Sequence, residues 1–414
     1  MKEKVFSRYE VFVIALLTIV QFTVVLDFMV LSPLGAILMP ALKITPAQFG
    51  AVVSAYAFSA GASGLLAAGF ADKFDRKKLL LFFYGGFIIG TTFCALAPDY
   101  HDLLLARIIT GIFGGVLSSI SFAIITDLFK LQVRGRVMGF VQMAFASSQV
   151  LGIPIGLYFA NKFGWHSPFI MIVIVCVIVG ILIIAFLKPI DGHLKVPSTR
   201  NPFQHLTKTI SQRVYLRAFA ATTLLATGGF MLMPFASAFS VYNLGISLNE
   251  LPLLYMVTGI FSMVTGPLIG KLSDQAGKYN VFVFGSLVTM IVVAVYCNLG
   301  ITPLWIVLVL NIIMFAGVSS RIITSSALVT AVPVPTDRGS FMSINSSVQQ
   351  ISGGIATFIA GKIVVETAGG KLEHYDTLGY VVIGAMVITI IMMYSIHLYV
   401  TTKSKFEVTA QRPR

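Results

Sequence analysis

Three ionisable residues stand inside long apolar stretches of this 414-residue sequence: Asp27, Arg107 and Arg321. A charged side chain at the centre of a bilayer costs roughly 2.5–3.5 kcal/mol even on the lenient scale of membrane insertion, so such residues are functional candidates by default. A carboxylate can bind and release a proton, and a guanidinium can neutralise that carboxylate or hold an anion. We therefore expect the chemistry of the chain at these three positions.

Asp27 and Arg107 are predicted to form a pair. Asp27 lies 17 residues beyond Glu10, about 25 Å along a helix, and Arg107 lies about two turns into its own helix from the opposite end. A carboxylate that is paired when the site is empty and protonated when the pair breaks would couple proton movement to a conformational change. The alternative is a static structural pair. No other acid and no histidine lies deep in an apolar stretch.

Arg321 lies some 18 residues into an apolar stretch, and no acid in the second half of the chain matches its depth. A lone guanidinium in a membrane must face a wet cavity, bond to carbonyls or hold an anion. One interpretation is contact with a negatively charged or acceptor-rich substrate. The other is hydrogen bonding to Asn311, Asn345, nearby serines or the backbone.

Polar side chains spread through the apolar stretches are candidates for lining a substrate cavity. Besides Arg321, those expected to bind substrate are Gln21, Gln142, Gln149, Asn345 and Gln349. Gln142 and Gln149 are seven residues apart, which places them on one face of a regular helix. Among the aromatic and methionine residues, those beside polar positions include Phe28 and Phe230.

The composition decides which solvent surrounds these residues. Hydrophobic residues make up 57% and charged residues 11% of the chain, and the mean hydropathy is +0.91, whereas a soluble domain carries about 25% charged residues. Lipid must therefore be the solvent. The net charge of +13 does not indicate a nucleic-acid binder, because the Lys and Arg fall in short gaps between apolar runs. Three distant cysteines in apolar runs and the absence of metal-ligand spacing predict no metal or other cofactor.

The apolar stretches predict an all-α membrane protein with twelve transmembrane helices in two pseudo-symmetric six-helix bundles. The predicted spans are 10–39, 47–70, 79–97, 102–128, 136–160, 166–187, 218–242, 250–271, 279–299, 302–332, 339–365 and 377–400. A polar stretch separates the sixth from the seventh. We expect an N-terminal bundle over 1–187, a cytoplasmic linker over 188–217, and a C-terminal bundle with a short tail over 218–414.

Basic residues predict the orientation. With the N-terminus inside, 23 of the 29 Lys and Arg fall on the cytoplasmic side, 4 fall outside and 2 lie within spans. This is the positive-inside pattern of an inner-membrane protein. Both termini are therefore expected in the cytoplasm, and we expect the chain to work as a monomer in the lipid bilayer of the plasma membrane.

The two halves echo each other in sequence. The segment 68–77 after the second span is similar to 270–278 after the eighth. Asp72 of the first segment and Asp274 of the second are 202 residues apart. Parallel repeats of this kind predict a substrate site between the halves, near the bilayer midplane. We interpret the charged residues of these two segments as a latch to the neighbouring half that holds the outward-open state; the alternative is a topology anchor alone. The latch residues are Asp72, Arg76, Asp274 and Lys278.

Three motifs carry a resemblance to the major facilitator superfamily over essentially the whole chain. The loop 68–77 resembles the pattern Gly-x-Leu-Ala-Asp-Arg-x-Gly-Arg-Lys between the second and third helices, with Ala68 and Asp75 in place of its glycines. Residues 105–111 resemble the arginine motif of the fourth helix, and 26–33 resemble the acidic first-helix motif of the drug:proton antiporter branch. The fifth-helix antiporter signature departs from its pattern, since Gly152 and Pro154 are not adjacent.

The resemblance implies a secondary transporter that exports a small organic molecule in exchange for protons. Because the fifth-helix motif is degenerate, a facilitator or importer of an organic anion on the same fold stays open. An intramembrane enzyme would need paired acids, a Ser/His pair or a metalloprotease motif within spans, and a channel would need a ring of charges lining a pore; the sequence has neither. It also has no phosphate-binding Gly-x-x-x-x-Gly-Lys-Ser/Thr loop, so direct use of ATP is not expected.

Overall fold

The fold is almost entirely helical. The structure, a computed structural model, describes residues 6–67, 71–195, 209–334, 337–367 and 369–410. The helices of the first half are α1 (Arg8–Leu42), α2 (Pro46–Ala67), α3 (Arg76–Leu96), α4 (Tyr100–Leu128), α5 (Leu131–Ser147), α6 (Ile153–Phe163) and α7 (Ser167–Phe186). Short turns, η1 (Ala71–Lys73) and η3 (Gly192–Lys195), follow α2 and α7.

The second half repeats this arrangement. Its helices are α9 (Arg213–Phe230), α10 (Ala236–Ala238), α11 (Leu251–Ala276), α12 (Lys278–Tyr296), α13 (Leu304–Thr330), α14 (Arg338–Ile363) and α15 (Tyr375–Ala410). A small antiparallel hairpin, β1 (Val365–Glu366) and β2 (Leu372–Glu373), connects α14 to α15. The predicted bundle limits at 187 and 217 remain a prediction, and part of the predicted linker, 196–208, lies outside the described residues.

Polar caps mark where several helices begin. Ser7 and Glu10 form a reciprocal capping box at the start of α1. Asp75 accepts a hydrogen bond from the Lys78 amide at the start of α3, and Asp99 accepts one from the His101 amide at the start of α4. These side chains satisfy amide groups that have no partner within the helix. Asp75, which replaces a glycine of the family pattern, therefore has a structural use here.

Two predicted spans are not regular helices. The span predicted over 136–160 contains a π-helical turn, η2 (Ser148–Gly152), between α5 and α6. The turn ends two residues before Pro154, whose missing amide cannot continue the ladder of hydrogen bonds. The span predicted over 218–242 breaks at η4 (Met233–Phe235), which contains Pro234, and ends in the π-helical turn η5 (Phe239–Asn243).

Eleven spans of the described chain are long and apolar enough to cross a membrane. The remaining predicted span, 339–365, corresponds to α14, which is 26 residues long but carries many polar side chains. α14 packs extensively against α2 and α9, so these helices cover the buried part of its polar surface. With α14 included, the described residues contain the twelve membrane-spanning segments that the sequence predicts.

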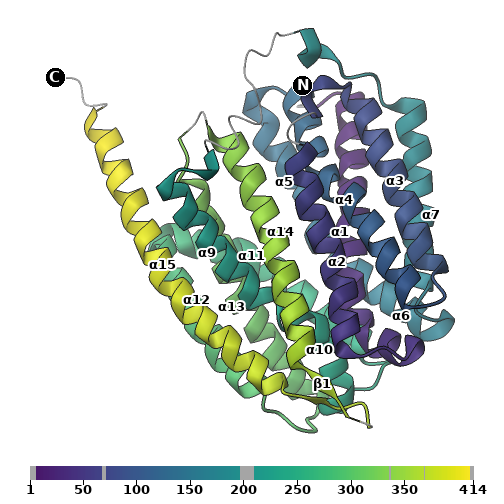
Figure 1. The fold of residues 1–414 in the computed structure, drawn as a ribbon. Coiled ribbons are helices and arrows are strands. Elements are labelled where there is room, and N and C mark those ends of the chain that lie inside the picture. Colours follow the sequence, from purple (N-terminus) through teal and green to yellow (C-terminus); the bar gives the residue numbers. More distant parts are fainter. Residues whose placement is uncertain (1–5, 68–70, 196–208, 335–336, 368, 411–414) are drawn as a thin grey trace, which may run out of the picture.

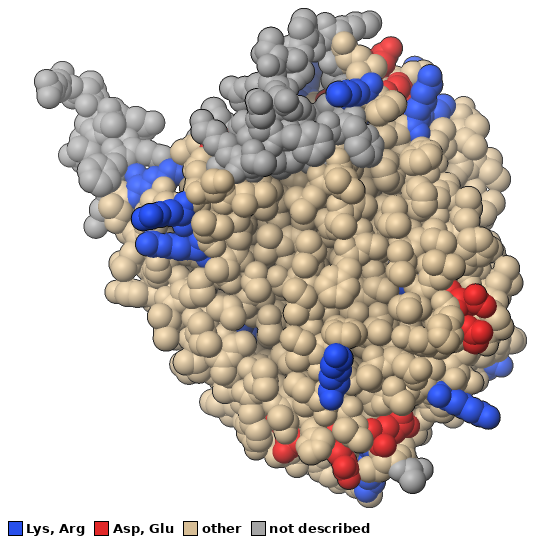
Figure 2. Space-filling view, viewed as in Figure 1, with Lys and Arg blue, Asp and Glu red and all other residues tan. Residues whose placement is uncertain are grey.

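The twelve segments form two bundles that stand side by side (Figure 1). Both chain termini lie at one end of the molecule, which we call the terminal end; the β1–β2 hairpin lies at the other, which we call the hairpin end. Charged side chains gather toward these two ends, and a broad belt with few charged side chains separates them (Figure 2). Large apolar side chains such as Ile291, Phe284 and Ile391 are 66% exposed, as expected of a surface that faces lipid.

The bundles contact each other most closely toward the hairpin end. α2 packs along α14, and a Cβ atom on Gly50 would lie 3.1 Å from the Cα atom of Gly361. The Ser237 hydroxyl donates to the carbonyl of Ser32 (2.9 Å) on α1. The Tyr242 hydroxyl donates to the carbonyl of Ala36, one turn further along α1. These contacts join opposite bundles near the ends of α1, α2, α10 and α14.

Candidate functional site

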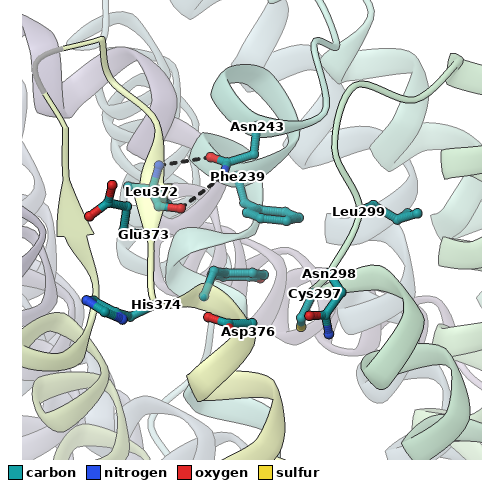
Figure 3. Close-up of a pocket in the computed structure, with 10 residues that line it drawn as sticks. Phe239, Asn243, Cys297, Asn298, Leu299, Leu372, Glu373, His374 and Asp376 are labelled. Carbon is teal, nitrogen blue, oxygen red and sulfur yellow. Dashed lines mark hydrogen bonds between the residues drawn. The ribbon is translucent and has the colours of Figure 1, made fainter.

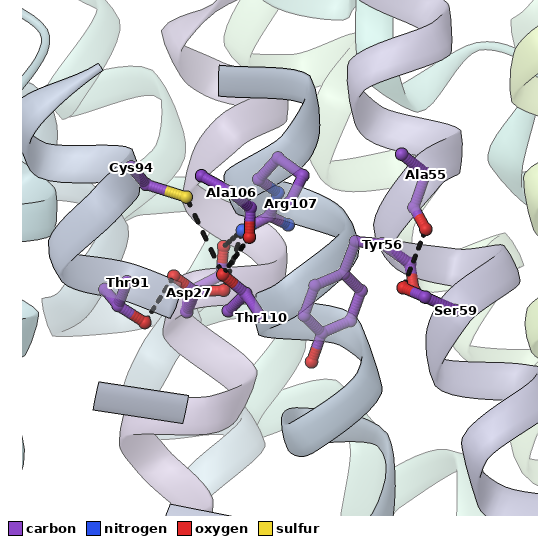
Figure 4. Close-up of polar contacts among 9 residues, drawn as sticks. All are labelled: Asp27, Ala55, Tyr56, Ser59, Thr91, Cys94, Ala106, Arg107 and Thr110. Carbon is purple, nitrogen blue, oxygen red and sulfur yellow. Dashed lines mark hydrogen bonds and ion pairs between the residues drawn. The ribbon is translucent and has the colours of Figure 1, made fainter. Parts of the chain in front are cut away.

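Asp27 and Arg107 meet in the interior of the first bundle, as the sequence predicts. Arg107 on α4 donates through Nη1 to the Asp27 Oδ2 atom at 2.7 Å and to the Asp27 carbonyl at 3.4 Å (Figure 4). The side chain of Asp27 is 0% exposed and that of Arg107 is 1% exposed. The pair is therefore sealed from solvent, and each charge is compensated by the other.

Side chains of α2 and α3 hold this pair in place. The ring of Tyr56 lies 4.5 Å from the guanidinium carbon of Arg107, a cation–π contact, and Thr91 donates to the Asp27 Oδ1 atom at 3.4 Å (Figure 4). α4 can approach α2 this closely because position 111 is a glycine: a Cβ atom there would lie 2.5 Å from the Tyr56 carbonyl oxygen. Four helices thus converge on one buried charge pair.

This arrangement makes protonation of Asp27 and separation of the pair mutually dependent. If a proton neutralises the carboxylate, Arg107 is left as a buried charge without a counter-ion, which is strongly unfavourable. The Nε atom of Arg107 already has no hydrogen-bond partner among the described residues. A proton is therefore accommodated only when the guanidinium gains other partners or water.

Arg321 lies inside the second bundle and is paired with no acid that the structure describes. Its side chain is 4% exposed, and its Nε and Nη2 atoms have no hydrogen-bond partner in the described part of the chain. Of the partners in the predicted alternative, the two asparagines bond elsewhere: the Asn311 amide donates to the Val307 carbonyl, and Asn345 accepts from Thr222. Bonding of Arg321 to serines or to the backbone stays a prediction.

The other predicted substrate residues are not gathered at one point. Gln21 is buried and exchanges hydrogen bonds with Ser118 of α4, whereas Asn345 joins α14 to α9. Gln142 and Gln349 are exposed and Gln149 is half-buried. The π-helical turn that begins at Ser148 interrupts the periodicity that places Gln142 and Gln149 on one face. Their binding of substrate stays a prediction.

The predicted latch residues contact partners within their own bundles. Arg76 donates to Asp127 of α4 at 2.9 Å and to the carbonyl of Ala71. Lys278 and Asp274 lie 3.9 Å apart on the exposed terminal end of α11 and α12. The side chain of Asp72 lies outside the described residues. The latch to the neighbouring half stays a prediction for another conformation.

A pocket of about 370 Å³ opens near the hairpin end of the second bundle (Figure 3). It lies between η5, the segment after α12 and the β2–α15 connection, with Asn243, Asn298, Glu373, His374 and Asp376 among its lining residues. No residue predicted from the sequence lines it. Its distance in the fold from the buried ion pair sets it apart from the chemistry described above.

Sequence reasoning missed Tyr56 and Thr91, the two side chains that support the ion pair. Both carry a hydroxyl in an otherwise apolar span, and this was the only available signal. Many other hydroxyl residues share that signal and bond instead to a carbonyl of their own helix, as Thr92 does to Ile88. Only the packing of α2 and α3 around α1 distinguishes the two classes.

A family model described as Major Facilitator Superfamily matches residues 17–357 and 218–413. The chain belongs to this superfamily. The uncharacterized MFS-type transporter YceJ of Bacillus subtilis is 25% identical over 396 residues, which cover 95% of this chain and 97% of that protein. Multidrug resistance protein 3 of the same bacterium is 32% identical over 148 residues, 36% of this chain and 29% of its own length.

Solved structures of the superfamily share the fold. A bacterial homologue of the human lysosomal transporter Spinster, inward-facing and unoccupied, has a TM-score of 0.71 at 16% identity and covers 99% of both chains. The xylose transporter XylE of Escherichia coli, inward open, has a TM-score of 0.70 at 16% identity, covering 92% of this chain and 95% of its own. This superfamily member is thus a multi-pass membrane protein and a secondary transporter that works by alternating access.

Proposed function

We propose that this transporter exports a small organic solute in exchange for protons, with Asp27 as the proton-binding residue and Arg107 as its partner. The supporting observation is the sealed ion pair, with its 2.7 Å contact and its nearly complete burial. In one conformation the pair is closed to protons. In another, water reaches it, a proton neutralises the carboxylate and Arg107 is released, so proton binding biases the exchange between conformations.

The proposed orientation places both termini in the cytoplasm of a cell whose plasma membrane holds the transporter. The charge asymmetry of the loops supports this placement. The terminal end is then cytoplasmic and the hairpin end faces outward. Because the two bundles contact each other toward the hairpin end, the described conformation corresponds to one closed to the outside.

Substrate binding belongs between the bundles in this scheme, through the residues predicted from the sequence. These are Gln21, Gln142, Gln149, Arg321, Asn345 and Gln349. Rocking of the bundles would close the terminal end and bring Asp72, Arg76, Asp274 and Lys278 within reach of the opposite bundle. The pairing of Arg76, Asp274 and Lys278 within single bundles here is what a released latch requires.

The test is proton flux in proteoliposomes that contain the purified full-length protein. In wild type, an imposed gradient of a transported solute should drive proton movement; in Asp27→Asn it should not, while solute counterflow is retained. Asp102→Asn is the matched control, since Asp102 is an exposed acid in the first turn of α4 and its loss should change nothing. Unchanged proton coupling in Asp27→Asn would remove the proposal.

A facilitator or importer of an organic anion is the second candidate function. The unpaired guanidinium of Arg321 favours it, because an uncharged or cationic solute would leave that charge uncompensated. The two candidates differ in one measurement: a facilitator moves solute down its own gradient at the same rate with and without a pH gradient.

A further inference from the structure

Half of the buried polar atoms without a partner in the described part of the chain lie on two neighbouring helices of the second bundle. In the described part of the chain, six buried side-chain nitrogen or oxygen atoms have no hydrogen-bond partner, and three of them belong to Arg321 and Ser286. Arg321 is on α13 and Ser286 on α12, two helices in close contact. Since buried polar groups are nearly always hydrogen-bonded, these atoms each call for a partner that the described residues do not supply.

The three atoms have the chemistry of an anion site. They are the Nε and Nη2 atoms of Arg321 and the hydroxyl oxygen of Ser286. Nε and Nη2 form one edge of the guanidinium, the edge that binds a carboxylate with two parallel hydrogen bonds. The ring of Phe282 lies 6.0 Å from the guanidinium carbon. Ser286 follows Phe282 by four residues and is therefore on the same face of α12.

Among the described residues, no acid lies at this depth to act as a counter-ion. The described acids from α9 to β1 are Glu250, Asp274, Asp337 and Glu366, and all of them lie at helix ends or in connections. Arg321, by contrast, lies 17 residues after the start of the 27-residue helix α13. An anion from outside the chain is thus the natural partner of this buried cation.

Gly228 of α9 leaves space beside the guanidinium. A Cβ atom at this position would lie 3.6 Å from the Nη2 atom and 3.7 Å from the Nη1 atom of Arg321. These are ordinary contact distances, so alanine would fit without distorting the helix and would occupy the space beside these donors. The next residue, Gly229, is exposed, and a Cβ atom there would meet nothing within 4 Å.

We propose that the Nε–Nη2 edge of Arg321, with the hydroxyl of Ser286 and the space left by Gly228, binds the carboxylate of an organic anion, and that organic anions are the substrates of this transporter. The inference rests on the proposed transport function for its biological meaning. It adds the substrate class and the atoms that recognise it.

The test is binding to the purified full-length protein, measured as the shift of its thermal unfolding midpoint at constant ionic strength. The probes are the carboxylates acetate, benzoate and naphthoate, the uncharged benzamide, and the inorganic anions chloride and phosphate. At least one carboxylate should stabilise wild type in a saturable manner, and benzamide should not. Absence of a shift with all three carboxylates would overturn the proposal, and equal shifts with chloride or phosphate would assign the site to an inorganic ion and reject the substrate class.

Variants distinguish a binding role from a structural one. Arg321→Gln should raise the midpoint of the ligand-free protein, because it removes an unpaired buried charge, and should abolish the carboxylate shift. A residue that merely stabilised the fold would lower the midpoint when replaced. Arg321→Lys keeps the charge but loses the planar fork, so its affinity should fall at least tenfold.

The two neighbouring glycines provide a matched pair. Gly228→Ala should weaken carboxylate binding at least tenfold with an unchanged ligand-free midpoint, whereas Gly229→Ala should bind as wild type does. Equal affinity in the two variants would contradict the site. Asp27→Asn should still bind the carboxylate, so a failure of proton coupling and a failure of anion binding are separate outcomes.

Discussion

At the scale of single residues, burial makes the partners of a charge interdependent. Asp27 and Arg107 are both almost completely buried and are joined by one short contact. Removing one member of such a pair leaves an uncompensated charge, whereas removing both leaves only neutral groups. Arg321 has no such partner among the residues that the structure describes. The two bundles therefore hold charges of different kinds: one compensated by a described acid, the other without an acid partner among the described residues.

This reasoning predicts strong non-additivity at the ion pair. Arg107→Gln should lower the free energy of unfolding by about 3–5 kcal/mol because it strands a buried carboxylate, and adding Asp27→Asn should recover at least half of that loss. The measurement is equilibrium unfolding of wild type, both single variants and the double variant in detergent micelles. Simple addition of the two single effects would show that the charges do not stabilise each other.

At the scale of helices, close approach depends on glycines whose neighbours are fixed by packing. A Cβ atom on Gly115 of α4 would lie 2.5 Å from the Cα atom and from the carbonyl oxygen of Ala60 on α2. A Cβ atom on Gly85 of α3 would meet nothing within 4 Å. The two positions look alike in sequence, since each is a glycine in a glycine pair inside an apolar span.

These two glycines should therefore respond in opposite directions to alanine. Gly115→Ala overpacks the α2–α4 contact and should reduce the free energy of unfolding by about 1–3 kcal/mol. Gly85→Ala should leave it unchanged or raise it by about 0.5–1 kcal/mol, because alanine restricts the unfolded chain more than glycine does. Thermal unfolding of the two variants tests this prediction. If both variants lose the same free energy of unfolding, close contact between α2 and α4 is not the role of Gly115.

The sequence predicted the helices better than their irregularities. Length and hydropathy located the spans because lipid imposes both, and the depth of Asp27 and Arg107 along their helices was enough to predict their contact. The irregularities near Pro154 and Pro234 follow from the missing amide of proline, but a proline does not by itself specify the π-helical geometry at 148–152. Likewise, nothing in the sequence indicated that Tyr56 would lie under Arg107 or that Gly228 would face Arg321, since both contacts join residues distant in sequence.

At the scale of the whole molecule, the contacts between the bundles must break and re-form during alternating access. Near the hairpin end, a Cβ atom on Gly361 of α14 would lie 2.8 Å from the carbonyl oxygen of Pro46 and 3.2 Å from the Cα atom of Ala47 on α2. Further along, Phe28 of the first bundle lies 6.0 Å from Phe230 of the second. The first contact controls how tightly the hairpin end closes. The second joins the helix of Asp27 to the helix of Gly228.

A larger side chain at Gly361 should shift the molecule away from the conformation described here. Gly361→Val would act as a wedge between α2 and α14, so the conformation that is open at the hairpin end should gain population. Gly384→Val is the matched control, because Gly384 is an exposed glycine of α15 with no neighbour within 4 Å of a Cβ atom. Electron-electron distances between spin labels at Lys162 and Asn298, two exposed residues at the hairpin ends of opposite bundles, should lengthen in Gly361→Val and stay as in wild type in Gly384→Val. If the wedge leaves the distance distribution unchanged, the α2–α14 contact is not the gate, and closure of this end depends on α1 and α10 instead.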